Sequence, residues 1–163
     1  MSDALLPALE ACAQALHAPG QPLAIYRAVD AAMQRVIGHK LFTLLVADGD
    51  EVARIYSSNP TAYPVSGRKP MNRTPWGDVV LRDRKVWVAK GPADIEWAFF
   101  DHKLIFSLGL GQCINVPVAW DGRTIGTINV LDAEGRYGEE HGALAARFAP
   151  FLVAPYLAAA RPR

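Results

Sequence analysis

Three side chains in the middle of the chain have the chemistry that a reaction on a small molecule would need. Cys113 is a potential nucleophile or redox thiol, and Asp101 and His102 precede it as a potential acid and base. A cysteine becomes reactive where a neighbouring base or cation lowers the pKa of its thiol. The sequence therefore allows catalysis by Cys113 or acid–base catalysis by Asp101 and His102. The alternatives are a thiol in a pocket wall and a solvated helix end.

Aromatic and amide side chains near these residues indicate a binding cavity. The stretch 92–108 carries more aromatic surface than one face of a short helix can bury against a sheet, so part of it could line a cavity. Amide groups could orient a flat or apolar ligand there. We expect a small organic ligand, with its identity and any cofactor left open. The side chains expected to contact it are Trp76, Trp97, Phe100, Asp101, Ile105, Cys113, Asn115 and Asn129.

A β-hairpin from Cys113 to Asp132 must position several of these side chains. Asp121-Gly122 suits a two-residue type I′ turn, because both central residues of that turn need positive φ angles. A regular register pairs Trp120 with Arg123 and alternates the side chains between two faces. The face expected beneath helices takes Ile114, Val116, Val118, Ile125 and Thr127, and the other takes Cys113, Asn115, Pro117, Gly126, Ile128 and Val130. Asn129 reaches the cavity only if Pro117 or Gly126 marks a bulge.

The chain before this hairpin predicts two helices and then the start of a sheet. Apolar residues recur at helical spacing over residues 3–18 and 22–38. Strand-like runs at 41–47 and 52–57 are joined by a short turn. An irregular excursion follows, in which Arg68, Lys69 and Arg73 could bind an anion or could simply be solvated.

The remaining elements are short except for the last. Thr74 can cap a short helix beginning at Pro75, and a strand is expected at 85–88. A helix is expected over 92–108. The last helix is expected to be kinked or split at Pro150 and Pro155.

The order of these elements, together with two segments, resembles the GAF domain family. The segments are Gln112 to Val118 (QCINVPV) and Asp121 to Val130 (DGRTIGTINV), and the acidic start of the last helix follows them. The resemblance implies an α+β fold, in which an antiparallel sheet carries the terminal helices on one face. A ligand pocket under loops and short helices would occupy the other face. It also implies a sensory or regulatory domain that binds a small molecule.

This reading treats the chain as one stand-alone domain over residues 1–163. The parts are N-terminal helices over 1–38, a sheet with pocket-forming insertions over 41–132 and a C-terminal helix over 137–160. The family includes free methionine sulfoxide reductases, which need one thiolate to attack and another to resolve the sulfenic acid. The second thiol here, Cys12, is expected in a helix core on the opposite side of the sheet. We therefore expect a sensor, with a small enzyme as the alternative.

The charge balance and the Cys and His content limit which partners, metal sites and compartments are expected. The 17 basic and 16 acidic residues leave a net charge of +1, which gives no electrostatic argument for a nucleic-acid or anionic-membrane partner. The N-terminal residues lack the basic region with which a secretory signal peptide begins, so no such signal is expected. The two cysteines lack the spacing of a zinc site. His17, His39 and His141 stand apart, so no metal site is expected. These features suit a reduced, cytoplasmic protein.

The last helix also suggests self-association. Its apolar residues cover more than one buried stripe, and the first helix adds further leucines. Symmetric dimers commonly cover such surface, so we expect a homodimer through the terminal helices, or a protein partner there. The residues concerned are Leu5, Leu6, Leu9, Phe148, Phe151, Leu152, Val153, Tyr156 and Leu157.

Overall fold

The strands of the chain form one antiparallel sheet in the computed structural model, which describes residues 2–160 apart from the side chains of Ser2 and Lys69. Within that range the sheet has six strands in the order β3-β2-β1-β6-β5-β4. The first and last long strands, β1 and β6, therefore pair at its centre. The strand bounds are β1 Leu41–Asp48, β2 Glu51–Ser57, β3 Lys69–Pro70, β4 Trp87–Val88, β5 Gln112–Trp120 and β6 Arg123–Asp132.

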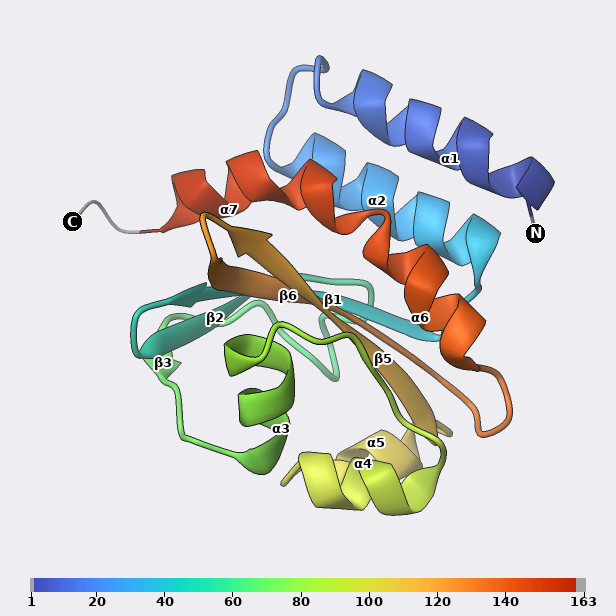
Figure 1. The fold of residues 1–163 in the computed structure, drawn as a ribbon, viewed down its shortest axis with the longest axis vertical. Coiled ribbons are helices and arrows are strands. Elements are labelled where there is room, and N and C mark those ends of the chain that lie inside the picture. Colours follow the sequence, from blue (N-terminus) through green and yellow to red (C-terminus); the bar gives the residue numbers. More distant parts are fainter. Residues whose placement is uncertain (1, 161–163) are drawn as a thin grey trace.

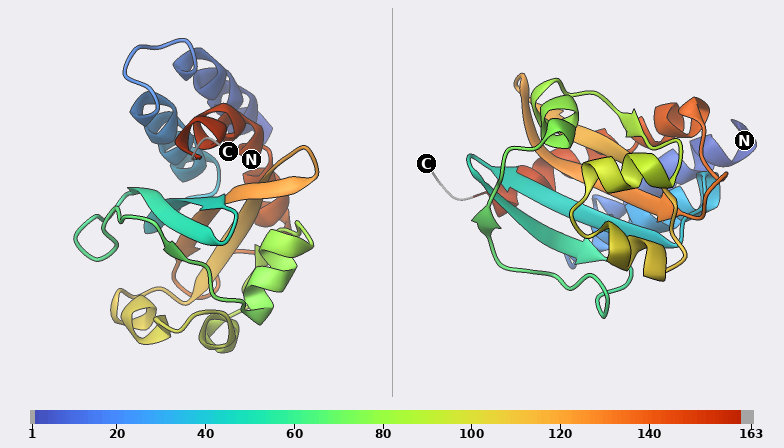
Figure 2. Two further views of the ribbon diagram at one scale, coloured as in Figure 1. Left: turned by 90° about the vertical axis from the view of Figure 1, so that its left-hand side faces the viewer. Right: turned by 90° about the horizontal axis from the view of Figure 1, so that it is seen from below.

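The helices form separate layers on the two faces of this sheet (Figures 1 and 2). α2, α6 and α7 cover one face, and α1 lies over α2. α3, α4 and α5 lie on the opposite face. The helix bounds are α1 Ser2–Ala15, α2 Leu23–Val36, α3 Pro75–Gly77, α4 Pro92–Ala98, α5 His102–Ser107, α6 Glu139–Ala146 and α7 Val153–Ala159. A π-helical turn, Asp78–Arg82, continues α3, and a 3-10 turn, Ala149–Leu152, precedes α7. The α+β architecture expected from the sequence is confirmed.

The main core lies between the sheet and the terminal helices. The stripe of α2 that includes Ile25, Val29 and Met33 is buried there, as its helical spacing predicts. From the C-terminal part of the chain, Phe148, Leu152 and Tyr156 are each 0% exposed. These three side chains therefore belong to the core of the chain itself, and they do not widen an exposed apolar surface as the sequence suggested.

The principal hairpin has the expected turn but a different register. Asp121 and Gly122 have φ angles of 49° and 72°, as a type I′ turn requires, and Trp120 pairs with Arg123. Val118 then pairs with Gly126 and Ala119 with Thr124, so Ile125 is the extra residue of a β-bulge.

Because of this bulge, the residues of β6 that follow Ile125 face the opposite side of the sheet from the side expected in a regular register. Ile128 and Val130 lie in the helix-facing core, so their expected position on the cavity face was wrong. Thr127 and Asn129 pair with Pro117 and Asn115, which places them on the cavity face instead.

Two predicted helices are divided. The stretch 92–108 consists of α4 and α5, because Phe99 has the extended φ and ψ angles of −127° and 126° that end α4. The last helix consists of α6, a 3-10 turn that contains Pro150, and α7. Pro155 lies inside α7 without breaking it, because it falls in the first turn, where a backbone N–H has no helical partner. Thr74 caps α3 as expected, its hydroxyl oxygen accepting from the Gly77 N–H at 3.0 Å.

Candidate functional site

A cavity of about 220 Å³ lies on the face of the sheet that carries the short helices. Its floor comes from β1, β2, β5 and β6, and its cover from α3 and the α4–α5 segment. Most of the side chains that the sequence assigned to a ligand site line this one cavity. They are Trp76, Asp101, Ile105, Asn115 and Asn129, whereas Phe100 is 96% exposed and only borders the cavity.

The floor of the cavity is a connected set of amide groups. Asn115 and Asn129 face each other across the β5–β6 pair, and the Asn115 amide nitrogen donates to Asn129 Oδ1 at 2.7 Å. Trp76 Nε1 donates to Asn115 Oδ1 at 3.1 Å, and the Asn129 amide nitrogen donates to Thr43 Oγ1 at 3.2 Å. The network ties α3 to three strands and fixes the direction in which both amides point. One N–H of Asn115 and one lone pair of Asn129 are not used in this network.

One end of the cavity carries charged groups. The Tyr63 hydroxyl donates to Asp101 Oδ2 at 2.7 Å, and the Arg54 guanidinium carbon lies 4.9 Å from the centre of the Tyr63 ring. Burial and the hydrogen bond to Asp101 raise the pKa of Tyr63 above its ordinary value. Burial lowers the pKa of Arg54, although Tyr63 and Asp101 oppose that shift. A cationic, an anionic and a phenolic group therefore converge at this end.

Sequence reasoning missed Arg54 and Tyr63. Arg54 is a charged residue in the interior of a mostly apolar strand, which is a signal that could have identified it. Its place in the cavity also depends on a second bulge, where Leu44 pairs with Tyr56 and Leu45 with Arg54. Tyr63 lies in the irregular excursion, where no periodicity indicates the direction of a side chain.

Cys113 is 0% exposed and does not line the cavity, although its apolar cluster includes Tyr63 and Ile105 of the cavity wall. Its thiol points to Asn115 Oδ1 at 3.4 Å, and burial raises its pKa well above the ordinary value. Cys12 is buried in the core on the other face of the sheet, where burial raises its pKa to about 11. In the described part of the chain, no hydrogen bond joins Cys113 to Asp101 or His102.

The remaining two predicted residues lie outside the cavity wall. His102 places its Nδ1 2.9 Å from the Phe99 carbonyl oxygen, so that interaction is local to the break between α4 and α5. Trp97 is 52% exposed and packs on Trp87, with 5.9 Å between ring centres. Phe99, which the sequence did not single out, lines the cavity instead and packs on Trp76 at 5.6 Å.

Within residues 2–160, no group of three or more His, Cys, Asp and Glu side chains is arranged to hold a metal ion. No single helix in that range is long and apolar enough to cross a membrane. One pair of helical segments, Glu139–Ala146 and Ala149–Ala159, has sufficient length and apolar composition together, but it is bent by 42°.

Comparison with known proteins agrees with this architecture. Residues 24–152 match the GAF domain family, whereas no protein with a curated description matches the chain. The fold is similar to the GAF domain of a phosphoenolpyruvate-protein phosphotransferase from Coxiella burnetii. That structure has a TM-score of 0.75 and 17% identity, and the match covers 95% of this chain and 94% of that chain.

Two other similar structures hold or process small molecules. The free methionine-R-sulfoxide reductase from Neisseria meningitidis, solved in complex with its substrate, has a TM-score of 0.68 and 19% identity over 94% of this chain and 87% of that chain. The chromophore-binding domain of a bacteriophytochrome from R. palustris has a TM-score of 0.62 and 13% identity over 89% of this chain and 57% of that chain.

These identities are low enough that the structural likeness establishes the fold alone. The family match, in contrast, extends from α2 to the turn before α7. GAF domains are generally small-molecule-binding sensory or regulatory domains. The chain belongs to the GAF domain family.

Proposed function

We propose that the cavity binds a small organic ligand and that the terminal helices convey its occupancy to a second copy of the chain or to a partner protein. The observation that carries this proposal is the set of polar groups that converges on one cavity. Asn115 and Asn129 form its floor, and Arg54 and Asp101 lie at one end. Convergent polar groups among apolar walls are typical of small-molecule sites.

The size of the cavity restricts the ligand. Its volume of about 220 Å³ is below the roughly 300–1,000 Å³ of sites for drug-sized ligands. We propose a compact metabolite, smaller than a tetrapyrrole, with a flat or apolar part against Trp76 and Phe99. Its polar part would meet Arg54 and Asp101, which favours a ligand that carries both a hydrogen-bond donor and an acceptor.

A path from the cavity to the helices runs through the excursion between β2 and α3. Tyr63 in this excursion lies in the cavity wall. Arg68, five residues later in the chain, donates to the Ala159 carbonyl oxygen at the end of α7 at 2.6 Å. Arg68 also lies 3.2 Å from Asp48 at the end of β1. A ligand that moves Tyr63 would thus alter a segment that is bonded to the last helix.

Native mass spectrometry against a panel of metabolites tests the binding proposal. We expect one ligand per chain, and we expect Asn115→Ala to weaken its binding because the amide network loses its central member. Gln14→Ala replaces an exposed amide side chain of α1 outside the cavity and serves as the matched control. If the folded protein retains no member of the panel, or if both variants bind equally well, the proposal is wrong.

We also propose a two-fold dimer through the terminal helices. Leu6 of α1 is 62% exposed and Leu157 of α7 is 38% exposed, and Leu16 and Leu23 add 42% and 41% between α1 and α2. Sedimentation equilibrium should give the mass of two chains, and Leu6→Glu with Leu157→Glu should reduce it to one. A single-chain mass for the unaltered protein at micromolar concentration would exclude the dimer.

The enzymatic alternative is supported at one residue. Asp101 lines the cavity and is hydrogen-bonded to Tyr63, so it could serve as an acid or base there. Cys113 is fully buried with a raised thiol pKa, which argues against its role as a nucleophile. For any ligand that is turned over, Asp101→Asn should abolish turnover but only weaken binding, because an asparagine keeps the size and one oxygen acceptor of the aspartate.

We further propose a reducing compartment such as the cytoplasm, since both cysteines are free and buried.

A further inference from the structure

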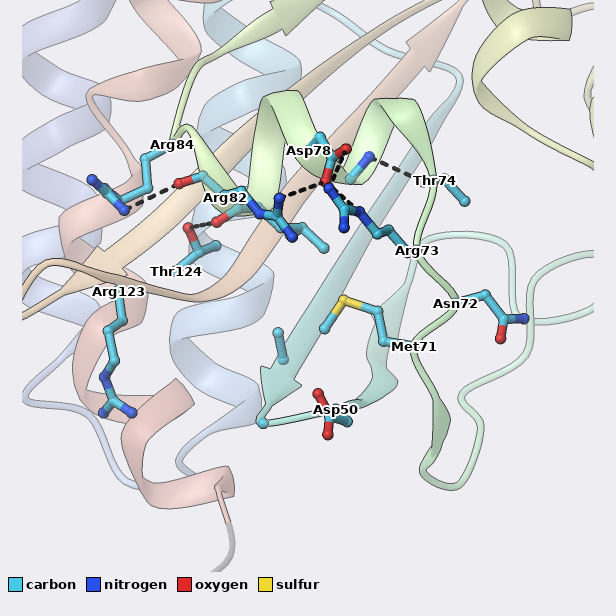
Figure 3. A pocket seen from close by; sticks show the side chains of 14 residues that line it. Asp50, Met71, Asn72, Arg73, Thr74, Asp78, Arg82, Arg84, Arg123 and Thr124 are labelled. Carbon is cyan, nitrogen blue, oxygen red and sulfur yellow. Dashed lines mark hydrogen bonds and ion pairs between the residues drawn. The ribbon is translucent and has the colours of Figure 1, made fainter.

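A second hollow, on the other side of α3, is lined by arginines. It has a volume of about 520 Å³ and lies between the β1–β2 turn, residues 71–74, the π-helical turn and the β5–β6 hairpin. It shares no lining residue with the cavity described above. The charged residues that line it are Asp50, Arg73, Asp78, Arg82, Arg84 and Arg123 (Figure 3).

The charge of this hollow differs from that of the chain. Four arginines against two aspartates give its lining a net charge of +2, whereas the entire chain carries only +1. Guanidinium groups are planar forks that bind the oxygens of phosphate and carboxylate groups in pairs. Four of the 17 basic residues therefore line one hollow, where their net charge exceeds that of the two acidic residues beside them.

Most of the N–H groups of these arginines make no hydrogen bond or ion pair in the part of the chain that the structure describes. Arg73 and Arg82 approach the same carboxylate, that of Asp78, at 3.3 Å and 3.7 Å. One nitrogen of Arg84 donates to the Arg82 carbonyl oxygen at 3.1 Å. Arg123 extends from the hairpin without a marked bond to the other residues drawn in Figure 3. Since each guanidinium carries five N–H donors, a bound anion would find unused donors on every arginine.

The backbone that presents these side chains is uncommon. Asp78 and Arg82 are the ends of a π-helical turn, a conformation that is rare and is frequent at functional sites. Arg84 has a φ angle of 54°, which side chains other than glycine, asparagine and aspartate seldom adopt. Both features concern the segment that lines the hollow.

We propose that this hollow binds a small anion with two or more negative charges on oxygen atoms, of the phosphate-ester or polycarboxylate type. Arg84 and Arg123 bind it directly. Arg73 and Arg82 turn from Asp78 towards it, so that the Asp78 carboxylate competes with the ligand. The sequence had suggested Arg68, Lys69 and Arg73 for an anion. Arg68 is instead bonded to Ala159, and the Lys69 side chain lies outside the described part of the chain.

Isothermal titration calorimetry of the full chain tests the proposal. Pyrophosphate represents the phosphate ligands and citrate the polycarboxylates, and a salt concentration of about 0.15 M screens distant charges. We expect at least one of these probes to bind with one site per chain. Arg123→Gln should weaken binding about threefold to tenfold, between the effect of an exposed ion pair and that of a charge-assisted hydrogen bond. Arg35→Gln removes an exposed arginine of α2 outside the hollow and should leave binding unchanged.

A second variant, Asp78→Asn, should change the affinity in the opposite direction from Arg123→Gln. Asp78→Asn removes the competing carboxylate, so it should tighten binding of the same probe by about threefold or more. The thermal midpoint of each variant shows whether it is folded. The proposal is wrong if neither probe binds, if Arg35→Gln weakens binding as much as Arg123→Gln does, or if folded Asp78→Asn binds more weakly than the unaltered protein.

Discussion

Replacing Gly126 by alanine should destabilise the fold severely, because this residue is packed tightly between the neighbouring strand β1 and the Tyr156 ring of α7. A Cβ at this position would overlap both the Leu45 carbonyl oxygen and the Tyr156 ring. Neither group can move freely. Leu45 belongs to β1, where Val46 pairs with Gly126, and Tyr156 is 0% exposed. An alanine must therefore separate β6 from β1 or push Tyr156 out of its site.

The magnitude follows from these contacts. Overpacking a well-packed core costs about 1–3 kcal/mol. Displacing Tyr156 also strains the hydrogen bond from its hydroxyl to the Thr127 carbonyl oxygen, 2.8 Å long, which contributes about 1 kcal/mol. The sum is about 2–4 kcal/mol, and at roughly 2–4 °C per kcal/mol for a chain of this size the midpoint should fall by about 5–15 °C.

Urea and thermal denaturation of two alanine variants test this reasoning. Gly67 has open space around its Cβ position and no positive φ angle, so Gly67→Ala should change stability by less than about 0.5 kcal/mol. Tyr156→Phe isolates the hydrogen bond and should cost about 1 kcal/mol. A Gly126→Ala protein that unfolds at the same midpoint as Gly67→Ala would refute the close approach of helix and sheet.

Three further predictions concern Tyr156, Cys113 and Arg68. Because burial raises the pKa of Tyr156 above the value of about 10 for an unfolded tyrosine, its contribution to stability is present below about pH 10 and is lost as the pH rises further. The urea midpoint should therefore fall as the pH is raised above about 10, and less steeply in Tyr156→Phe. Iodoacetamide at pH 8 should leave Cys113 unmodified until urea unfolds the chain, and fast labelling of the native protein, followed by peptide mass mapping, would contradict its burial. Arg68→Met should cost about 1–3 kcal/mol through the lost hydrogen bond to Ala159 and the lost ion pair with Asp48, measured by urea denaturation against Arg35→Met as the exposed control.

The parts of the fold that local chemistry determines were predictable from the sequence. Asp121-Gly122 specified its turn, because few other residue pairs accept two positive φ angles. The cap at Thr74 and the buried stripe of α2 likewise follow from adjacent residues. The break at Phe99 was not predictable, since the apolar spacing of 92–108 continues across it and tertiary packing selects the extended conformation.

The candidate site was predictable in composition but less so in geometry. Trp76 was identified as an aromatic residue of a short helix, and Asp101 and Asn115 from their residue types and their place near or in the hairpin, and the structure brings all three to one cavity. Cys113 was misplaced, although its strand face was predicted correctly. A position on the cavity face does not distinguish a side chain in the wall from one buried beneath it, because that difference depends on helices and loops far along the chain.

The bulge at Ile125 explains why one strand can serve both a polar cavity and an apolar core. In a regular register Asn129 would face the helices among Ile114, Val116 and Phe148, where an amide without a partner costs about 1–3 kcal/mol. Ile128 would then occupy the cavity floor. One extra residue reverses both placements at once and sets the Asn129 amide opposite that of Asn115. The stability of the core and the polarity of the cavity thus depend on the same local irregularity, next to Gly126, where the last helix contacts the sheet.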